Sequence, residues 1–390
     1  MVGGGIGGLC TAVALRRVGW DVHVYERAEE LRAVGGGLTL ASNALRALRW
    51  LGLEEQVRAL AAPLVLGAIR TVSGAPLVRA GPAMPEALGV GLHRADLQHL
   101  LVEALGPERV HLGHVCDGVV DEAAAVRATF TNGASPGAAL LVAADGLRST
   151  VRRLLHGSAE PRYAGATAWR GVAEIGPDAA GPAAAGGLHA ASGVTVTSSE
   201  SWGRGRRFGI VPIGAGRVYW FAVLRTPAGG RDPDGGAKPA LQSLFRGWHP
   251  PIEALIAATR EDAIVRHDLF DRPPLPLPWG RGRITLLGDA AHPTTPNVGQ
   301  GACQAIESAV VLARHMRHAV DTAGALRAYE AERAPRVATI TRLSWRLGQL
   351  AQREGRVAAA LRDGLVRLMP TALQRRQLER VVGYDVTRGC

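Results

Sequence analysis

The residues of this chain whose spacing could do chemistry lie first in a glycine-rich motif at its start. Residues 3–8 read GGGIGG, and Glu26 follows at the end of the next apolar segment. Glycines let a backbone turn tightly and approach a pyrophosphate, whose charge meets the free N–H groups of the following helix. An acid at Glu26 suits ribose hydroxyls and disfavours a 2′-phosphate. The motif therefore predicts a site for FAD or NAD, with contacts from Gly3, Gly5, Gly7, Gly8 and Glu26.

A second glycine-acid motif lies near the other end of the chain, where residues 288–293 read GDAAHP and residues 296–301 read PNVGQG. Asp289 follows an apolar run, so its carboxylate should emerge where a strand ends and ligands bind. There it could accept hydrogen bonds from a ribityl chain, although a helix-capping aspartate has the same pattern. The helix that begins near Gln300 would direct its positive end at a flavin ring. Together the two motifs predict one FAD stretched across a single domain.

These motifs require particular elements around them. Residues 6–19 carry apolar side chains at helical spacing, and residues 21–26 alternate like a strand, which together form the expected βαβ unit. Only Met1 and Val2 precede the glycines, so we expect a shortened first strand. The histidines are isolated and show no metal-ligand spacing, so no metal site is predicted.

The composition changes between about residues 163 and 265, where strand-like runs alternate with glycine-containing turns. This pattern predicts a mainly antiparallel sheet inserted into the cofactor domain. After Gly301 the pattern predicts helices over residues 302–320, 323–350 and 357–382.

The predicted fold class is therefore α/β, with a Rossmann-like FAD-binding domain, an inserted β-sheet substrate domain and C-terminal helices. The FAD-binding domain is expected to comprise residues 1–65, 91–162 and 272–320. The substrate domain is expected to comprise residues 66–90 and 163–271, and the helical segment residues 321–390. The long C-terminal helices could also pair two chains into a homodimer.

The formal net charge of +11 raises the question of a nucleic-acid partner. Lys238 is the only lysine, and the arginines are interspersed with alanine and glycine, as in proteins encoded by GC-rich genomes. Clusters such as Arg204, Arg206 and Arg207 lack interleaved stacking aromatics, so no nucleic-acid partner is expected. No apolar run is long enough to span a bilayer, the four cysteines are scattered and no signal peptide is evident. We therefore expect a cytoplasmic protein with no membrane partner.

A third motif, Asp145-Gly146 within ADGLRS, completes a pattern that resembles the class A flavoprotein monooxygenases. This is the aromatic hydroxylase group related to para-hydroxybenzoate hydroxylase. The resemblance also rests on HRADL at 93–97 and on the whole of 288–309, and TAWRG at 167–171 is similar to the salicylate- and urate-hydroxylase-like branch. One departure is Ser308, where the family usually has an acid.

The resemblance implies a set of FAD contacts, residue by residue. Glu26 and Arg27 would hold the adenosine half, with Thr39 and the backbone near Val115 as lesser contacts. Arg94 would contact the cofactor from its helix, and Asp145 would support both FAD and transient NAD(P)H docking. Asp289 would bind the ribityl chain. The residues that would face the isoalloxazine are Pro296, Gly299, Gln300 and Gly301.

The resemblance also implies a reaction. NADPH or NADH reduces FAD, O2 adds to the flavin, and the C4a-hydroperoxide transfers one oxygen atom to an electron-rich aromatic or polycyclic substrate. Such chemistry needs an apolar cover that excludes water. The strand residues that could supply the cover are Trp169, Trp202, Trp220 and Phe221, although an aromatic side chain on a strand more often belongs to the core. Arg170 is polar within such a strand and is our candidate for a substrate or flavin contact, while His189 and Tyr219 are the candidates for a catalytic base.

Two alternatives to this function stay open from the residues alone. A reductase or dehydrogenase of the same fold would keep the same cofactor motifs, and so would a flavin-binding protein with no activity. A flavin-dependent halogenase is disfavoured, because the chain lacks the WxWxIP segment and its only lysine lies in a Gly/Pro-rich loop.

Overall fold

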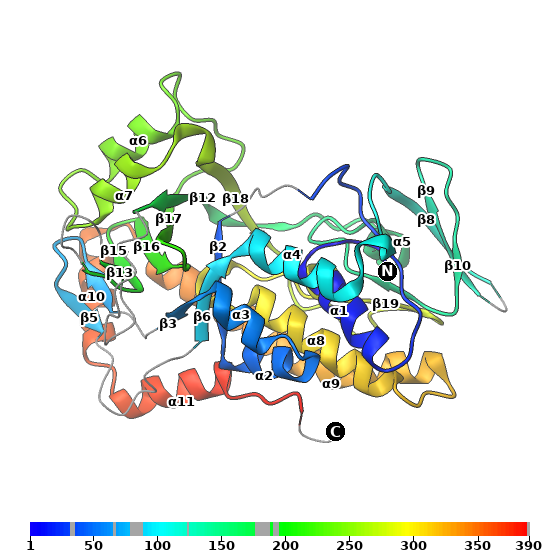
Figure 1. Ribbon diagram of the computed structural model, residues 1–390. Coiled ribbons are helices and arrows are strands. Elements are labelled where there is room, and N and C mark those ends of the chain that lie inside the picture. Colours follow the sequence, from blue (N-terminus) through cyan, green and yellow to red (C-terminus); the bar gives the residue numbers. More distant parts are fainter. Residues whose placement is uncertain are drawn as a thin grey trace.

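The structure, a computed structural model, describes residues 1–31, 36–64, 68–78, 89–122, 125–175, 188–189 and 195–387. Figure 1 shows a β-rich part with β12 and β15–β18 on one side, and the glycine motif with α1 and α4 on the other. The long helices α8 and α9 run along the base of the molecule.

A short parallel sheet lies at the centre of the cofactor half. β1 (Val24–Tyr25) pairs with β7 (Val110–His111), and β11 (Leu141–Ala143) pairs with β19 (Ile284–Leu286). Val2 joins the two pairs by one parallel bridge to β1 and another to β11. The sheet order is thus β7, β1, Val2, β11 and β19, and the shortened first strand consists of a single bridged residue.

Helices cover this sheet. α1 (Ile6–Arg17) begins directly after the glycine loop and packs against α8 (Gly301–Met316) and α4 (Arg94–Leu105). Its residues Leu9, Cys10 and Ala12 are fully buried, so α1 is anchored in the largest apolar core. The remaining helices of this half are α2 (Ser42–Leu51), α3 (Glu54–Leu60) and α5 (Thr150–His156).

Two small antiparallel sheets flank the cofactor half. One has the order β10, β9, β8 and the other the order β2, β6, β3. Their bounds are β8 (Cys116–Asp121), β9 (Val126–Phe130), β10 (Gly137–Ala138), β2 (Gly37–Ala41), β6 (Gly89–His93) and β3 (Ala62–Leu64).

The second half is built on a seven-stranded sheet with the order β18, β12, β17, β16, β15, β4 and β5. All neighbours are antiparallel except β15 and β4. The strands are β4 (Ile69–Thr71), β5 (Pro76–Val78), β12 (Arg162–Glu174), β15 (Ser199–Trp202), β16 (Arg206–Pro212), β17 (Arg217–Arg225) and β18 (Val265–Asp271). α6 (Ala237–Leu244) and α7 (Ile252–Ala258) contribute to one apolar core with this sheet, in which Phe208 stacks on Trp220. A separate hairpin pairs β13 (Leu188–His189) with β14 (Thr195–Val196).

The chain then continues through three helices: α9 (Thr322–Ala351), α10 (Arg356–Arg367) and α11 (Thr371–Val382). The single helix predicted over residues 357–382 is wrong, because Pro370 precedes α11 and its ring cannot continue the α10 hydrogen-bond ladder. Within the described ranges, every helix is too short or too polar to cross a membrane. The domain bounds predicted from the sequence stay a prediction.

Candidate active site

Two adjoining cavities, together called the trough, lie beside the glycine loop: the larger lies within the cofactor half, and the smaller lies between that half and the seven-stranded sheet. Their volumes are about 480 and 640 Å³, and both are lined by Gly5, Arg94, Ala144 and Gly146. Glu26 and Asp145 line the larger cavity, whereas Asp289 lines the smaller one. The motifs at the two ends of the sequence therefore open into two cavities that adjoin each other.

The glycine loop shapes the middle of this trough. Gly3 has a φ of +102°, and a side chain there would overlap the carbonyl oxygen of Ala144. A side chain at Gly8 would overlap the Gly3 carbonyl, so these two glycines allow the turn itself. Gly5 faces open space and precedes α1 without a side-chain cap, which leaves the N–H groups of the first turn free for an anion. Gly7 lines the smaller cavity.

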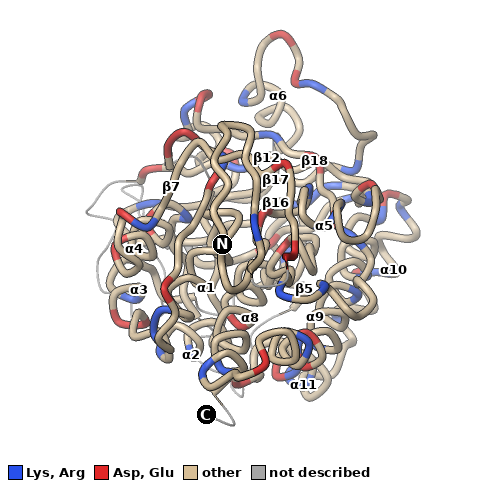
Figure 2. The backbone as a smooth tube through the Cα atoms, turned by 90° about the vertical axis from the view of Figure 1, so that its right-hand side faces the viewer, with Lys and Arg blue, Asp and Glu red and all other residues tan. Residues whose placement is uncertain are grey.

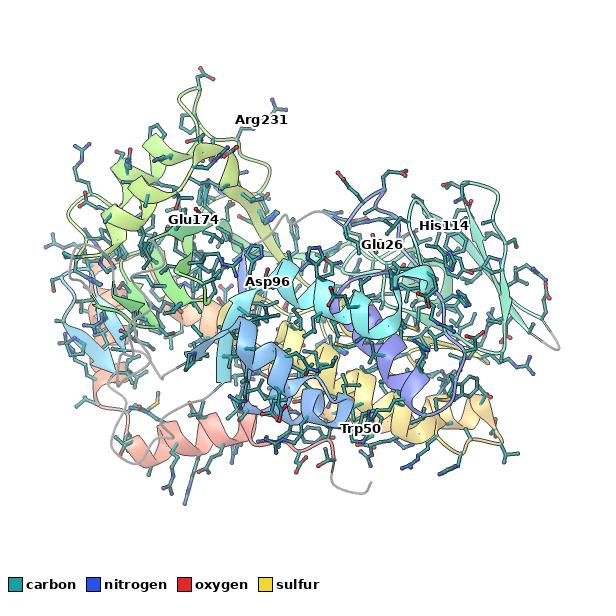
Figure 3. The ribbon with its side chains drawn as sticks, in the orientation of Figure 1. Glu26, Trp50, Asp96, His114, Glu174 and Arg231 are labelled. Atoms are coloured by element: carbon teal, nitrogen blue, oxygen red, sulfur yellow. The ribbon has the colours of Figure 1, made fainter. Side chains whose placement is uncertain are left out.

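Glu26 lies at the far end of the larger cavity, near His114 (Figure 3). Its Oε2 accepts a hydrogen bond from the Gly4 N–H at 2.6 Å, and its Oε1 accepts one from the Ala28 N–H at 3.0 Å. A carboxylate has about four acceptor positions, so Glu26 keeps capacity for a ribose while it braces the loop. Arg27 and Val115 line the same cavity.

Asp145 lies on the opposite wall, after β11. Its Oδ2 accepts a hydrogen bond from the Val151 N–H at 3.3 Å, but its buried Oδ1 has no partner among the residues that the structure describes. Burial raises the pKa of Asp145, and this effect outweighs the hydrogen bonds to the carboxylate, which lower it. Buried polar atoms are nearly always satisfied, so Oδ1 fits a site that receives a donor from a bound molecule.

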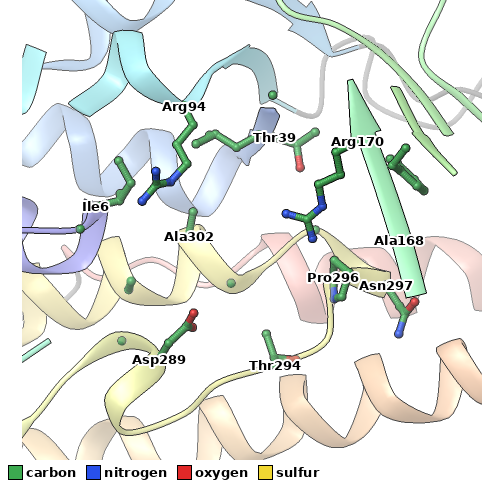
Figure 4. Close-up of a pocket in the computed structure, with 18 of the residues that line it drawn as sticks. Ile6, Thr39, Arg94, Ala168, Arg170, Asp289, Thr294, Pro296, Asn297 and Ala302 are labelled. Carbon is green, nitrogen blue, oxygen red and sulfur yellow. The ribbon is translucent and has the colours of Figure 1, made fainter. Parts of the chain in front are cut away.

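Asp289 lies in a short 3-10 helix (Gly288–Ala290) directly after β19. Its exposed surface faces the smaller cavity, where Arg94 approaches from the other side (Figure 4). The surrounding protein desolvates the carboxyl and raises the pKa of Asp289 to about 6, and the charge of Arg94 opposes this shift. The side chain is therefore directed at the ligand space.

The loop after Asp289 forms the floor of the smaller cavity. Pro296, Gly299 and Gly301 line it, and Thr39 lies so close that a side chain at Gly299 would press on its hydroxyl. α8 begins at Gly301 with no side-chain cap, so its positive end is open to the cavity. Gln300 does not line this cavity, although Gly299 and Gly301 on either side of it do, because its side chain is buried in the protein.

The wall opposite this floor comes from the seven-stranded sheet. Arg170 on β12 and Tyr219 on β17 both line the smaller cavity, and Arg170 extends toward Pro296 (Figure 4). Tyr219 is 8% exposed, and burial raises its pKa despite the charge of Arg170, so the phenol keeps its proton. The backbone of His189 lies in β13, but its side chain falls outside the described part of the structure.

The comparisons with known proteins agree with this geometry. The family model described as "FAD binding domain" matches residues 1–344. The chain is 41% identical over 376 residues to the aurachin C monooxygenase/isomerase of Stigmatella aurantiaca, which spans 95% of this chain and 93% of that protein. It is also 35% identical over 351 residues to an FAD-dependent urate hydroxylase of Klebsiella pneumoniae, covering 86% of each. The chain belongs to the class A FAD-dependent monooxygenases.

Solved structures support the same family. Klebsiella pneumoniae HpxO complexed with FAD and uric acid has a TM-score of 0.86 and 30% identity, and the match covers 97% of this chain and 95% of that one. A salicylate hydroxylase substrate complex, at 22% identity and a TM-score of 0.77, shows the shared fold. The predicted fold class, the FAD cofactor and the predicted monooxygenase activity are thereby confirmed.

In this monooxygenase the four aromatic residues expected to cover the flavin do not act together. The prediction is wrong for Trp169, Trp202 and Trp220, which line neither of the two cavities. Alternate residues of a strand face opposite sides of the sheet. Tyr219, Phe221 and Val223 on β17 therefore face the cavity, while Trp220 between them is fully buried in the core on the other side.

Arg207 is a cavity residue that sequence reasoning missed. It is 2% exposed, lines the smaller cavity and donates to Glu200 Oε1 at 2.9 Å and to Asn297 Oδ1 at 2.6 Å. From the sequence, Arg207 was considered only together with Arg204 and Arg206, as a cluster of charges without interleaved aromatic residues. The sequence does contain one indication that Arg207 is buried. Arg207 directly precedes the apolar run 208–211, so it belongs to the same buried strand.

A buried polar network lies behind the α8 terminus and holds Gln300. Gln300 accepts hydrogen bonds from Asn43 and Gln304, and Asn43 also donates to Glu307. Burial alone would raise the pKa of Glu307, but Arg333 at 2.7 Å and a second arginine lower it overall. This network ties α8 to α2 and α9, and so fixes the position of the loop at the cavity floor.

Ser308 is the residue at which the sequence resemblance led us to expect an acid. Its hydroxyl accepts from Arg333 Nε at 3.1 Å and lies 3.2 Å from His292 Nε2. Burial, followed by the nearby charge of Arg333, lowers the pKa of His292 to about 3 and keeps this histidine neutral. His292 and Ser308 therefore have a structural role, and the buried acid of this region is Glu307.

Proposed function

We propose that this monooxygenase takes electrons from NADH or NADPH and inserts one atom of O2 into a planar aromatic or polycyclic substrate. The substrate would lie in the smaller cavity, between the sheet wall and the 296–301 loop. Bound FAD would supply the electron transfer and the oxygen activation. The relatives named for urate and for aurachin C support a substrate of this class.

The trough suits one extended FAD. The adenosine half would lie in the larger cavity, where Glu26 is free to accept from the ribose and Arg27 and Val115 form the wall. The pyrophosphate would lie on the first turn of α1 beside Gly5, and the ribityl chain beside Asp289. Asp145 Oδ1 would gain the donor that it lacks.

The sheet wall would bind and orient the substrate. Ala168, Val211 and Phe221 present an apolar surface that excludes water from the reacting ring. The hydrogen-bond donors at this wall include Arg170, Arg207 and the Tyr219 hydroxyl, which can donate to a carbonyl or oxyanion on the substrate. Tyr219 acts as a donor in this proposal, since its raised pKa opposes the role of a base.

The observation that carries the proposal is that the cavity lined by Glu26 and the cavity lined by Asp289 adjoin each other and share Gly5 and Arg94 in their walls. The test is oxidation of NADH and NADPH by the FAD-loaded protein in air, with a panel of phenols, purines and polycyclic aromatics. We expect one or more aromatics to stimulate oxidation and to gain one 18O atom from 18O2. Oxidation that proceeds equally without oxygen, and yields no labelled product, would assign the protein as a reductase.

A further inference from the structure

Helix α10 has two apolar faces, of which one is packed. Ala359 and Val366 are each 5% exposed, and Val366 belongs to an apolar cluster with Leu77 and Trp202. Arg362, on the same side, donates to the backbone carbonyls of Gly203 and Ala351. These contacts fix the orientation of the helix on the edge of the seven-stranded sheet, beside β5 (Figure 1).

The opposite face of α10 and its C-terminal end present large apolar side chains to solvent. Val357, Leu361, Leu365 and Leu368 are 74%, 70%, 61% and 83% exposed. Their spacing of four, four and three residues places them in a single stripe. Leu373 at the start of α11 is also exposed. A contiguous exposed apolar stripe on a folded protein indicates a binding surface.

Arginines without acidic partners border this stripe. Arg353, Arg356, Arg367 and Arg376 are exposed, and none of them has an acidic group within 4 Å among the residues that the structure describes. The acids of the same segment are each paired with other arginines. The pairs are Glu354 with Arg225, Asp363 with Arg362, and Glu379 with Arg375.

We propose that α10 and the start of α11 dock the enzyme on an anionic lipid surface. The apolar stripe would enter the boundary between headgroups and acyl chains, and the unpaired arginines would contact lipid phosphates. None of the described helices can span a bilayer, so the contact is peripheral. α10 and α11 both lie at the periphery of the molecule (Figure 2). The proposal replaces the sequence-based expectation of no membrane partner.

A second copy of the chain is the alternative occupant, since the sequence indicates that the C-terminal helices could pair two chains. Charge disfavours it, because each copy would bring the same unpaired arginines and no unpaired acid to the contact. An anionic lipid surface instead complements both the exposed apolar side chains and the arginines that lack acidic partners. Helix α10, which carries the stripe, is also connected to the substrate wall. Trp202 packs beneath α10 and donates a hydrogen bond to Glu200, and Glu200 in turn accepts one from Arg207 in that wall.

The test is flotation of the FAD-loaded, full-length protein with vesicles of phosphatidylcholine alone or of equal parts phosphatidylcholine and phosphatidylglycerol. We expect at least about tenfold more protein to float with the anionic vesicles, and most of this binding to be lost in Leu361→Asp/Leu365→Asp. Arg356→Gln/Arg367→Gln should lose the anionic preference. The matched control is Val120→Asp/Leu154→Asp, which changes two exposed apolar residues elsewhere and should float like the wild type.

Retained flavin absorbance and an unchanged circular dichroism spectrum will show that each variant is folded. Failure of the wild type to float with either vesicle would overturn the proposal, as would equal flotation of Leu361→Asp/Leu365→Asp. Light scattering provides a third outcome. A dimeric wild type that the same double variant converts to a monomer would assign the stripe to a second copy and reject the lipid surface.

Discussion

Asp289 and Arg94 face each other across the smaller cavity, one from the turn after β19 and the other from the first turn of α4 (Figure 4). The surrounding protein desolvates the carboxyl and raises the pKa of Asp289 to about 6, and the charge of Arg94 opposes this shift. The same two side chains can therefore serve a ligand placed between them. Arg94 also lines the larger cavity, so it lies where the two halves of the trough meet.

The raised pKa of Asp289 predicts a pH effect on the apoprotein. A carboxyl whose pKa is higher in the folded state than in the unfolded state favours folding as the pH falls from about 6 toward 4. We expect Asp289→Asn to stabilise the apoprotein at pH 7 by about 1 kcal/mol, a figure reduced for the solvent in the cavity. Thermal unfolding at pH 5 and pH 7 measures this. An equal gain from Asp262→Asn, an exposed aspartate paired with Arg260, would contradict the assignment.

Arg170 and Tyr219 are predicted to contribute to substrate binding and to have no effect on FAD binding. Arg170→Gln and Tyr219→Phe should raise the KM for the substrate about tenfold, since each removes a hydrogen bond at a desolvated wall. Steady-state kinetics with the identified substrate, together with the FAD content, measure both effects. Arg225→Gln and Tyr163→Phe change residues that do not line the cavity and serve as controls. Loss of FAD in the first pair would contradict this division of roles.

Arg207 is predicted to hold Glu200 and Asn297 in place. Arg207→Gln should lower the free energy of unfolding by about 2 kcal/mol, because it leaves Glu200 without the guanidinium of a buried partner. Urea unfolding of the holoprotein provides the measurement. The neighbouring, exposed Arg204→Gln should change stability by less than about 0.5 kcal/mol. If the two variants lowered the free energy of unfolding equally, the predicted role of Arg207 in holding Glu200 and Asn297 would be contradicted.

Glu332 is predicted to control acid stability at the C-terminal end. A hydrogen bond from His315, together with the charge of Arg314, lowers the pKa of Glu332 to about 2. Because the folded state favours the ionised form, this stability is present above about pH 4.5 and is lost as the pH falls toward 2. Glu332→Gln should lose about 1 to 2 kcal/mol at pH 7 and show a flatter acid transition. An unchanged transition would contradict the pairing.

The cofactor motifs were predictable from the sequence because their chemistry is local. Gly3 and Gly8 are needed because a side chain at either position would overlap a backbone carbonyl, that of Ala144 or that of Gly3. A carboxylate that directly follows a strand, as Asp289 does, emerges at the edge of the sheet. These features depend on spacing along the chain and not on distant packing.

The substrate wall was less predictable because it depends on which face of each strand turns inward. Arg207 and Arg204 look alike in sequence, yet one is buried against Glu200 and the other is exposed. Trp220 and Tyr219 are consecutive, and only the tyrosine faces the cavity. The side chain of Gln300 turns into the network around Glu307, which assembles from helices far apart in the chain.

The central claim is that one FAD extends from Glu26 to Asp289, and titration of the apoprotein with FAD and with FMN tests it most directly. FMN lacks the adenosine half, so Glu26→Ala should weaken FAD binding about tenfold or more and leave FMN binding unchanged. Asp289→Ala should weaken both ligands by a similar factor. The account predicts one FAD per chain and this split between the two variants. Wild-type protein that binds no FAD, or variants that bind both flavins as tightly as the wild type, would contradict it.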